Sequence, residues 1–230
     1  MLKLKFIKLI GINGIFGLLT LNCIYFNKID KKNRINLVFD LDETLINSEK
    51  SKYIEDCNMN LFSPCDYVFR YMSEDIDDDD GDCDDVGTTK IIQVQKSYDV
   101  WIRPFVKILF SIISKYNNLY LMTNADIDYA NDICDYIGIN KYFIDKKFYD
   151  DIQTYNKKNN LSGKDLEIFG SSNTKNWILI DDLKSNSVKN QKFIHISPYS
   201  FYRSYDVELI KLFFSITYAN ILHIFEVEDE

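Results

Sequence analysis

The sequence has little histidine and no closely spaced cysteine pair. Only two histidines occur in 230 residues, and no Cys-x-x-Cys pair exists among the five cysteines, which are Cys23, Cys57, Cys65, Cys83 and Cys134. A structural zinc site needs clustered cysteine and histidine ligands, and a disulfide framework needs an even set of cysteines. Neither is expected here, and the cysteines fit reduced thiols of an intracellular protein in the cytosol or nucleus.

An excess of positive charge is also missing. The formal net charge is −8, and nine negative charges lie between residues 74 and 85, so the rest of the chain carries about +1. A near-neutral domain with one acidic loop lacks the basic surface that nucleic-acid binding requires, so no direct nucleic-acid binding is expected. The acidic run is predicted to be a solvated loop, because the residues around Gly81 do not follow the ligand spacing of an EF-hand.

Only one uncharged stretch is long enough to be considered as a membrane span. Residues 9–26 carry no charge and have lysines on both sides. As a helix this stretch would span about 27 Å, close to the thickness of the hydrocarbon core of a bilayer. Asn13, Thr20 and Asn22 reduce its hydrophobicity, and no signal-peptidase cleavage pattern follows it. Two interpretations stay open: an N-terminal anchor with the domain facing the cytosol, or a segment packed on the domain.

The rest of the chain alternates apolar runs of strand length with stretches of helical periodicity. Strands are predicted at 37–39, 119–122, 177–180 and 193–196, and helices at 104–113, 127–137 and 206–224. Continuous apolar runs are typical of strands covered on both faces, as in a parallel sheet flanked by helices. An insertion at about 48–97 would contain a β-hairpin, with strands at 67–69 and 91–94 on either side of the acidic run.

These elements predict an α/β domain at residues 36–225. It would be preceded by an apolar segment and basic tether at 1–35 and followed by an acidic tail at 226–230. In the helix after Arg103, Pro104 is expected at the first helical position. The apolar face of that helix would comprise Phe105, Ile108, Leu109, Ile112 and Ile113. The next helix would end at Gly138, with Ile127, Ala130, Ile133, Cys134 and Ile137 on one face.

Polar residues follow three of the predicted strands. Asp40 and Asp42 come after the first, Thr123 after the second, and Asp181-Asp182 after the strand at 177–180. Ligands bind at the carboxyl ends of parallel strands, so these side chains are expected to converge on one site. Acids so close together need a cation between them, and a divalent cation that prefers oxygen ligands is the natural candidate.

The run Asp40-Leu41-Asp42-Glu43-Thr44-Leu45 resembles the first motif of the haloacid dehalogenase (HAD) superfamily. The sequence of this motif is similar to that in the RNA polymerase II C-terminal-domain phosphatases and their NLI-interacting-factor-like relatives. Further matches are Arg103-Pro104, Tyr129-Ala130, Lys164-Asp165-Leu166, and Asp206 with Leu209. The chain departs from the family at Asn124, where a small residue is usual, and lacks a recognisable Arg-Glu pair near 146–149.

The resemblance implies a HAD-like (Rossmannoid) central parallel sheet and assigns a role to each residue of the site. Asp40 would be the nucleophile that forms an aspartyl-phosphate, and Asp42 the general acid and base. Phosphate oxygens would be bound by Thr123, Asn124, Thr44 and Lys164. The cofactor Mg²⁺ would be held by the Asp40 carboxylate, the Asp42 carbonyl and Asp182, with Asp181 orienting Lys164 or the metal-bound waters.

The function implied by the resemblance is a Mg²⁺-dependent phosphoserine/phosphothreonine protein phosphatase, with a phosphorylated protein or peptide such as the RNA polymerase II C-terminal domain as substrate. Two alternatives stay open at this point. The 48–97 insertion could act as a cap over small phosphorylated metabolites, or the fold could serve as a non-catalytic binding scaffold. Intact acids at Asp40, Asp42, Asp181 and Asp182 argue against the scaffold.

Overall fold

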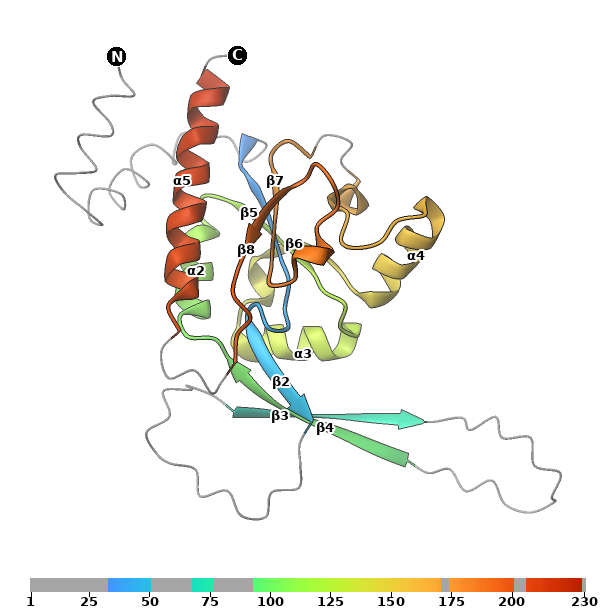
Figure 1. The fold of residues 1–230 in the computed structure, drawn as a ribbon. Helices are drawn as coiled ribbons and strands as arrows, with labels where there is room; N and C mark the ends of the chain where they lie inside the picture. The colour runs from blue at the N-terminus through green and yellow to red at the C-terminus, as the bar shows by residue number, and fades with distance from the viewer. Residues whose placement is uncertain (1–32, 51–67, 77–92, 171–173, 201–205, 229–230) are drawn as a thin grey trace, which may run out of the picture.

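A five-stranded parallel sheet forms the centre of the molecule (Figure 1). The computed structural model describes residues 33–50, 68–76, 93–170, 174–200 and 206–228. Within them the sheet order is β6-β5-β1-β7-β8. Its strands are β1 (Asn36–Phe39), β5 (Asn118–Met122), β6 (Phe143–Lys147), β7 (Trp177–Asp181) and β8 (Lys192–His195). All four strand pairings are parallel, which confirms the predicted α/β architecture.

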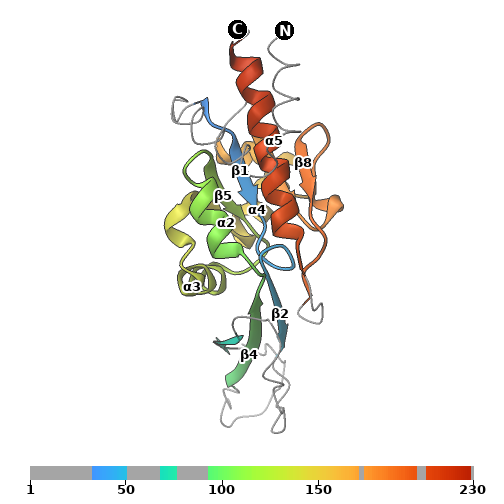
Figure 2. The same ribbon diagram turned by 90° about the vertical axis from the view of Figure 1, so that its left-hand side faces the viewer.

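The side chains of β1 alternate between two apolar layers. Leu37 and Phe39 pack with α2 (Val106–Ile113), α3 (Ile127–Ile137) and α5 (Glu208–Glu228). Val38 packs in the opposite layer with Ile152 of α4 (Tyr149–Asn159) and with a 3₁₀ turn, η3 (Leu166–Phe169). Both faces of the strand are therefore buried, as its uninterrupted apolar sequence predicted. In Figure 1 helices α2 and α5 lie together on one side of β1, and Figure 2 views the molecule from that side.

Two elements of this domain were not predicted, β6 and α4. Strand β6 has the sequence FIDKK and lies at an edge of the sheet, where its residues are half-buried or exposed. Helix α4 buries only one side chain, Ile152. Neither element has the apolar pattern that identifies a buried strand or an amphipathic helix, because each contributes little to the core.

The insertion forms a second, antiparallel sheet in the order β2-β4-β3. Its strands are β2 (Ile46–Lys50), β3 (Val68–Ile76) and β4 (Gln93–Ile102). The pairing of β3 with β4 confirms the predicted hairpin, but the insertion is wider than 48–97 because β2 begins directly after the Asp40–Leu45 turn. Residues 77–85, most of the acidic run, lie outside the described part of the chain.

The start of α2 differs from the sequence prediction. Pro104 precedes the helix, and Phe105 is its N-cap in the left-handed region (φ 71°), so Pro104 does not occupy the first helical position. Before the helix the Arg103 carbonyl accepts from the Val106 N–H (3.4 Å), which closes a turn over Pro104 and Phe105. The buried face of α2 is accordingly Val106, Leu109, Phe110 and Ile113, whereas Phe105 and Ile108 are exposed.

Helix α3 follows its prediction more closely. Ala130, Ile133, Cys134 and Ile137 are buried, and Gly138 ends the helix in the left-handed conformation (φ 79°), but Ile127 at the first turn is exposed. Cys134 is a free thiol. Helix α5 continues to Glu228, past the boundary expected at residue 225.

None of the helices in the described ranges is both long and apolar enough to cross a membrane. The apolar stretch 9–26 lies outside those ranges.

A buried arginine joins the loop after β1 to the start of α5. Arg103 Nη2 lies 3.0 Å from Asp206 Oδ2, and both side chains are almost completely buried. The same guanidinium donates to the carbonyls of Thr44 (2.8 Å) and Ser197 (2.7 Å) and lies over the ring of Tyr199. Arg103 therefore holds together three segments that meet beside the carboxyl ends of β1 and β7.

We expect Arg103→Met to lower the free energy of unfolding by about 3–5 kcal/mol, since it leaves the Asp206 carboxylate buried without its cation. Equilibrium urea unfolding measures this. The control is Lys211→Met, which removes an ion pair with Glu208 on the exposed surface of α5 and is expected to change stability by less than about 0.5 kcal/mol. Equal effects of the two substitutions would show that the Arg103 network does not stabilise the domain.

Candidate active site

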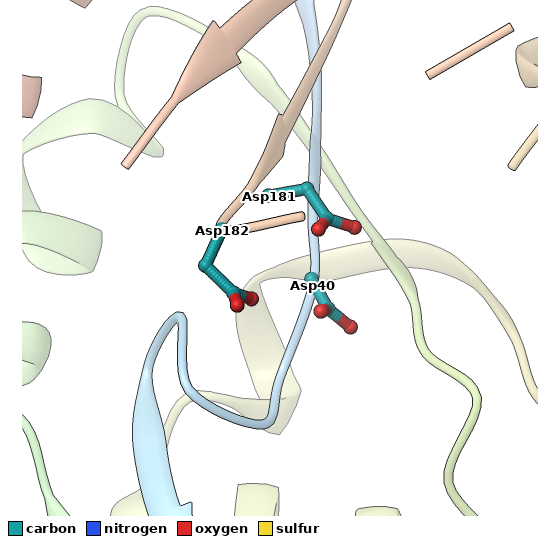
Figure 3. A group of neighbouring side chains, drawn as sticks. All are labelled: Asp40, Asp181 and Asp182. Carbon is teal, nitrogen blue, oxygen red and sulfur yellow. The ribbon is translucent and has the colours of Figure 1, made fainter. Parts of the chain in front are cut away.

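Three carboxylates meet at the carboxyl ends of β1 and β7. These strands are neighbours in parallel register, with Phe39 opposite Ile180, so Asp40 follows β1 where Asp181 and Asp182 end β7. One carboxylate oxygen from each of Asp40, Asp181 and Asp182 lies within 4.8 Å of the others, and all three residues are buried. Figure 3 shows their carboxylates directed into the same space. The sequence prediction that these acids converge is confirmed for this set.

The Lys164 ammonium lies between two of these acids. Its Nζ is 2.7 Å from Asp40 Oδ1 and 2.8 Å from Asp181 Oδ2, and the side chain is almost completely buried. Burial alone would lower the pKa of Lys164, but the two carboxylates outweigh it and raise that pKa above its ordinary value. Lys164 is therefore a fixed positive charge within the acidic cluster.

The loop that carries Lys164 is fixed by its backbone. The Lys164 N–H donates to the Asn186 carbonyl (2.7 Å), and Gln191 Nε2 donates to the Lys164 carbonyl (2.9 Å). Gly163 has φ 97°, and a Cβ there would lie 2.7 Å from the Asn186 carbonyl oxygen. Only glycine allows this approach, which brings the chain close enough for Lys164 to reach Asp40.

Asp181 has its hydrogen-bonding capacity filled by the protein. Besides Lys164, its carboxylate accepts from the Leu183 N–H (2.7 Å) and from Asn186 Nδ2, which lies 3.1 Å from Oδ1 and 3.0 Å from Oδ2. These donors fix the carboxylate in one orientation. The geometry thus favours the first of the two roles predicted for Asp181, the orientation of Lys164.

Asp40 has an unusual electrostatic environment. Burial raises the pKa of its carboxyl to about 7; Lys164 opposes this shift and Asp181 adds to it. Burial, followed by the charge of Asp181, also raises the pKa of Asp182. Within the described cluster one ammonium faces three carboxylates, so the ionised acids require additional positive charge.

The donor set fits a hard divalent cation such as Mg²⁺. All donors in the cluster are carboxylate oxygens, and neither histidine nor cysteine belongs to it. Asp40 and Asp182 have the oxygens that such an ion would take, because Asp181 is already committed to Lys164, Leu183 and Asn186. A bound cation would supply the positive charge that the cluster lacks.

Asp42 belongs to a separate part of the site. Its Oδ1 accepts from the Tyr129 hydroxyl (3.0 Å) and from Ser48 Oγ (3.1 Å), so α3 and the insertion strand β2 both contribute to it. Burial raises the pKa of Asp42, while these two hydrogen bonds lower it. The structure therefore does not bring the Asp42 carboxylate into the group with Asp40, Asp181 and Asp182. Ser48 was not among the predicted site residues, because it belongs to none of the motifs.

The predicted phosphate-binding residues have different environments. Thr123 is buried at the end of β5, and its Oγ1 accepts from the Ala125 N–H (3.2 Å). Asn124 is exposed beside it. Thr44, also predicted to bind phosphate, is fully buried; it donates to Asp182 Oδ1 (3.1 Å) and accepts from the Asp182 N–H (3.2 Å). The Thr44 hydroxyl is thus both donor and acceptor to Asp182. These two contacts indicate that Thr44 orients Asp182.

We expect Gly163→Ala to lower the free energy of unfolding by about 3 kcal/mol or more, because backbone strain adds to a clash with the Asn186 carbonyl. Gly170→Ala is the matched control: Gly170 has φ 80° but nothing within 4 Å of an added Cβ, so only strain of about 1–2 kcal/mol applies. Urea unfolding of both variants separates clash from strain. Equal losses would refute the close approach at Gly163.

We expect Mg²⁺ to raise the melting temperature of metal-depleted protein more at about pH 8 than at about pH 6. The pKa of Asp40 is about 7 in the folded protein and 3.8 in the unfolded chain. The contribution of Asp40 to the free energy of unfolding is therefore complete below pH 3.8 and is lost as the pH rises through about 7. The metal-depleted protein should therefore lose stability over this pH interval. Above it Asp40 is ionised, so Mg²⁺ binds without displacing the proton of that carboxyl.

Asp182→Asn should abolish this stabilisation by Mg²⁺, whereas Asp132→Asn, on the exposed face of α3, should leave it unchanged. Scanning fluorimetry over a magnesium titration measures both variants. A magnesium shift that is the same in the wild type and in Asp182→Asn would contradict the assignment of the metal site.

Two solved structures have a similar fold. One is titled as a fission yeast RNA polymerase II CTD phosphatase, Fcp1, bound to beryllium fluoride; it has a TM-score of 0.58 and 18% identity, and the match covers 89% of this chain and 55% of that chain. The other, titled as Fcp1, an essential RNA polymerase II CTD phosphatase, has a TM-score of 0.58 and 19% identity, covering 89% of this chain and 53% of that one. The chain thus spans about half the length of these proteins.

None of the curated proteins compared with the chain matches it significantly in sequence. Residues 35–223, which include every residue of the site described above, match the family of NLI interacting factor-like phosphatases. The parallel sheet, the three-carboxylate cluster and this match agree with one another, and the chain belongs to the NLI interacting factor-like phosphatase family.

Proposed function

We propose that this protein is a Mg²⁺-dependent phosphoserine/phosphothreonine protein phosphatase that acts through an aspartyl-phosphate at Asp40. The observation that carries the proposal is the Lys164 ammonium, 2.7 Å from Asp40 and 2.8 Å from Asp181. A carboxylate attacks a phosphate dianion only where the negative charge of both groups is compensated. Lys164 supplies such charge next to the nucleophile.

In the first step an Asp40 carboxylate oxygen attacks the phosphorus, and the bond from phosphorus to the seryl or threonyl oxygen breaks. Asp42 gives its proton to that leaving oxygen. In the second step Asp42 takes a proton from a water molecule, which attacks the phosphorus, releases inorganic phosphate and restores the Asp40 carboxylate. Asp40 lies beside Lys164 and Asp42 beside Tyr129 and Ser48, and these different environments support the division of roles.

The surroundings of Asp42 support its role as the proton carrier. Burial raises its pKa, which favours a proton on the carboxyl before the leaving group departs. The described hydrogen bonds from Tyr129 and Ser48 both end on Oδ1, so Oδ2 is the oxygen that would exchange the proton. Tyr129 and Ser48 are thus positioning residues for Asp42.

The remaining predicted residues divide into two groups. Lys164, Thr123 and Asn124 would bind the phosphate oxygens, with Thr44 assigned instead to the orientation of Asp182. Mg²⁺ would be held by the Asp40 carboxylate, the Asp42 carbonyl and Asp182. When bound, it would supply positive charge that keeps Asp40 ionised and offsets the charge of the phosphate.

The substrate we propose is a phosphorylated protein segment, such as the C-terminal domain of RNA polymerase II. The protein would meet this substrate in the cytosol or the nucleus. Two observations support this class. The similar solved structures are titled as phosphatases of that domain. The insertion also reaches the site directly: Ser48 of β2 contacts Asp42, and the Tyr98 ring on β4 lies 6.0 Å from that of Tyr129. Substrate choice would thus depend on the insertion.

We expect the wild type to hydrolyse p-nitrophenyl phosphate and a phosphorylated heptad-repeat peptide in the presence of Mg²⁺, and Asp40→Asn to reduce both rates by at least about a thousandfold. Phosphate release with and without Mg²⁺ is the measurement. Asp132→Asn, an exposed acid on α3, is the control and should retain full activity.

Equal rates for wild type and Asp40→Asn would overturn the proposed mechanism. Hydrolysis of sugar or nucleotide monophosphates that exceeds peptide hydrolysis by about tenfold or more would retain the mechanism but overturn the protein substrate. The absence of any Mg²⁺-dependent hydrolysis, together with no thermal stabilisation by beryllofluoride, would indicate a binding scaffold.

A further inference from the structure

An apolar groove lies between α5 and the edge of the parallel sheet, away from the catalytic acids. It has a volume of about 470 Å³ and is lined mainly by Ile35, Ile178, Phe193, Ile194, Tyr218 and Leu222. Strand β8, which forms one wall, is the last strand of the five-stranded sheet. An uncovered sheet edge beside apolar side chains is unfavourable in water, and proteins commonly cover such edges.

Helix α5 has apolar residues on two sides, although the described part of the domain covers only one. Leu209, Leu212 and Ile216 pack in the core, whereas Tyr218 is 63% exposed and Leu222 45% exposed. Ile210, Phe214, Tyr218 and Leu222 follow one another at four-residue spacing, which places neighbours in this series on the same side of the helix. A helix that is apolar on both sides is typically buried on both sides. The Tyr218 face therefore lacks a cover among the described residues.

The chain enters the domain beside this groove. His223, which lines the groove, has its Nε2 2.7 Å from the carbonyl oxygen of Asn33, and Ile35 lines the groove two residues later. The uncharged stretch 9–26 ends seven residues before Asn33. Seven residues extend over at most about 25 Å, so the groove is within reach of this stretch.

We infer that residues 9–26 pack into the groove between α5 and β8 of the same chain and cover the Tyr218 face. The composition of the two partners supports this occupant. Residues 9–26 are mostly apolar but contain Asn13, Thr20 and Asn22, which a bilayer core would penalise. The groove is likewise mainly apolar, and Asn176, Lys192 and Ser215 contribute polar groups to its lining. This inference is independent of the proposed phosphatase activity.

Cys23 lies within the stretch and provides a direct probe. The experiment is maleimide labelling of the full-length protein, followed by mass spectrometry of the peptide that contains Cys23. We expect Cys23 to react at least about tenfold more slowly in the native protein than in urea. Tyr218→Glu, which places a charge in the groove, should raise the native rate of Cys23 towards the rate in urea.

Two controls accompany the measurement. Tyr136→Glu changes the same residue type on the exposed surface of α3 and should leave the labelling rate of Cys23 unchanged. Cys134 reports on folding in every variant: it is completely buried, and burial raises the pKa of its thiol to about 12, so its labelling stays slow while the domain is folded.

Three results would overturn the inference. In the first, Cys23 of the native protein reacts as fast as in urea. In the second, its protection appears only when phosphatidylcholine vesicles are added, which would indicate a membrane anchor. In the third, protection falls on dilution of the protein, which would indicate that a second copy of the chain fills the groove. Protection that is independent of vesicles and of dilution, and is lost only in Tyr218→Glu, supports it.

Discussion

The buried ammonium of Lys164 is the interaction on which the rest of the site depends. It joins Asp40 at the end of β1 to Asp181 at the end of β7, two strands that are neighbours in the sheet but far apart in sequence. A buried charge is tolerated only when its partners are close and well oriented. The left-handed Gly163, the Asn186 carbonyl and the Gln191 amide bring Lys164 to these partners. The need to hold one cation between two acids thus explains the conformation of a whole loop.

The arrangement gives neighbouring acids different contacts. Asp181 accepts from Lys164, the Leu183 N–H and Asn186 Nδ2, whereas Asp182 contacts Thr44. Thr44 then orients Asp182, and Arg103 fixes the backbone around Thr44. Asp42, outside this cluster, receives its hydrogen bonds from Tyr129 and Ser48. Two adjoining networks therefore hold Asp40 and Asp42 in different environments.

Much of the fold and of the site could be predicted from local sequence. Strands β1, β5 and β7 are apolar runs, and Asp40, Asp181 and Asp182 meet because the parallel strands β1 and β7 end at one edge. Elements that contribute little to the core could not be found in this way, since β6 and α4 bury few apolar side chains. Helix α2 begins later than predicted, after a turn in which the Arg103 carbonyl accepts from the Val106 N–H.

Contacts between distant residues were beyond the sequence patterns. Arg103 and Asp206 each matched a family motif, but nothing in either motif indicates that they form a buried ion pair. The contact of Thr44 with Asp182 and that of Ser48 with Asp42 are likewise products of tertiary structure. Patterns identify residues by type and spacing, and only the packed sheet shows which hydroxyl serves which carboxylate.

The most direct test of this account is chemical identification of the covalent intermediate. Protein mixed briefly with a phosphopeptide and Mg²⁺ is quenched in acid and treated with borohydride, which reduces an acyl phosphate to an alcohol. The account predicts that residue 40 is converted from aspartate to homoserine, and that Lys164→Met strongly lowers the yield. Conversion at another carboxylate, or turnover of the peptide with no reducible intermediate, would contradict it.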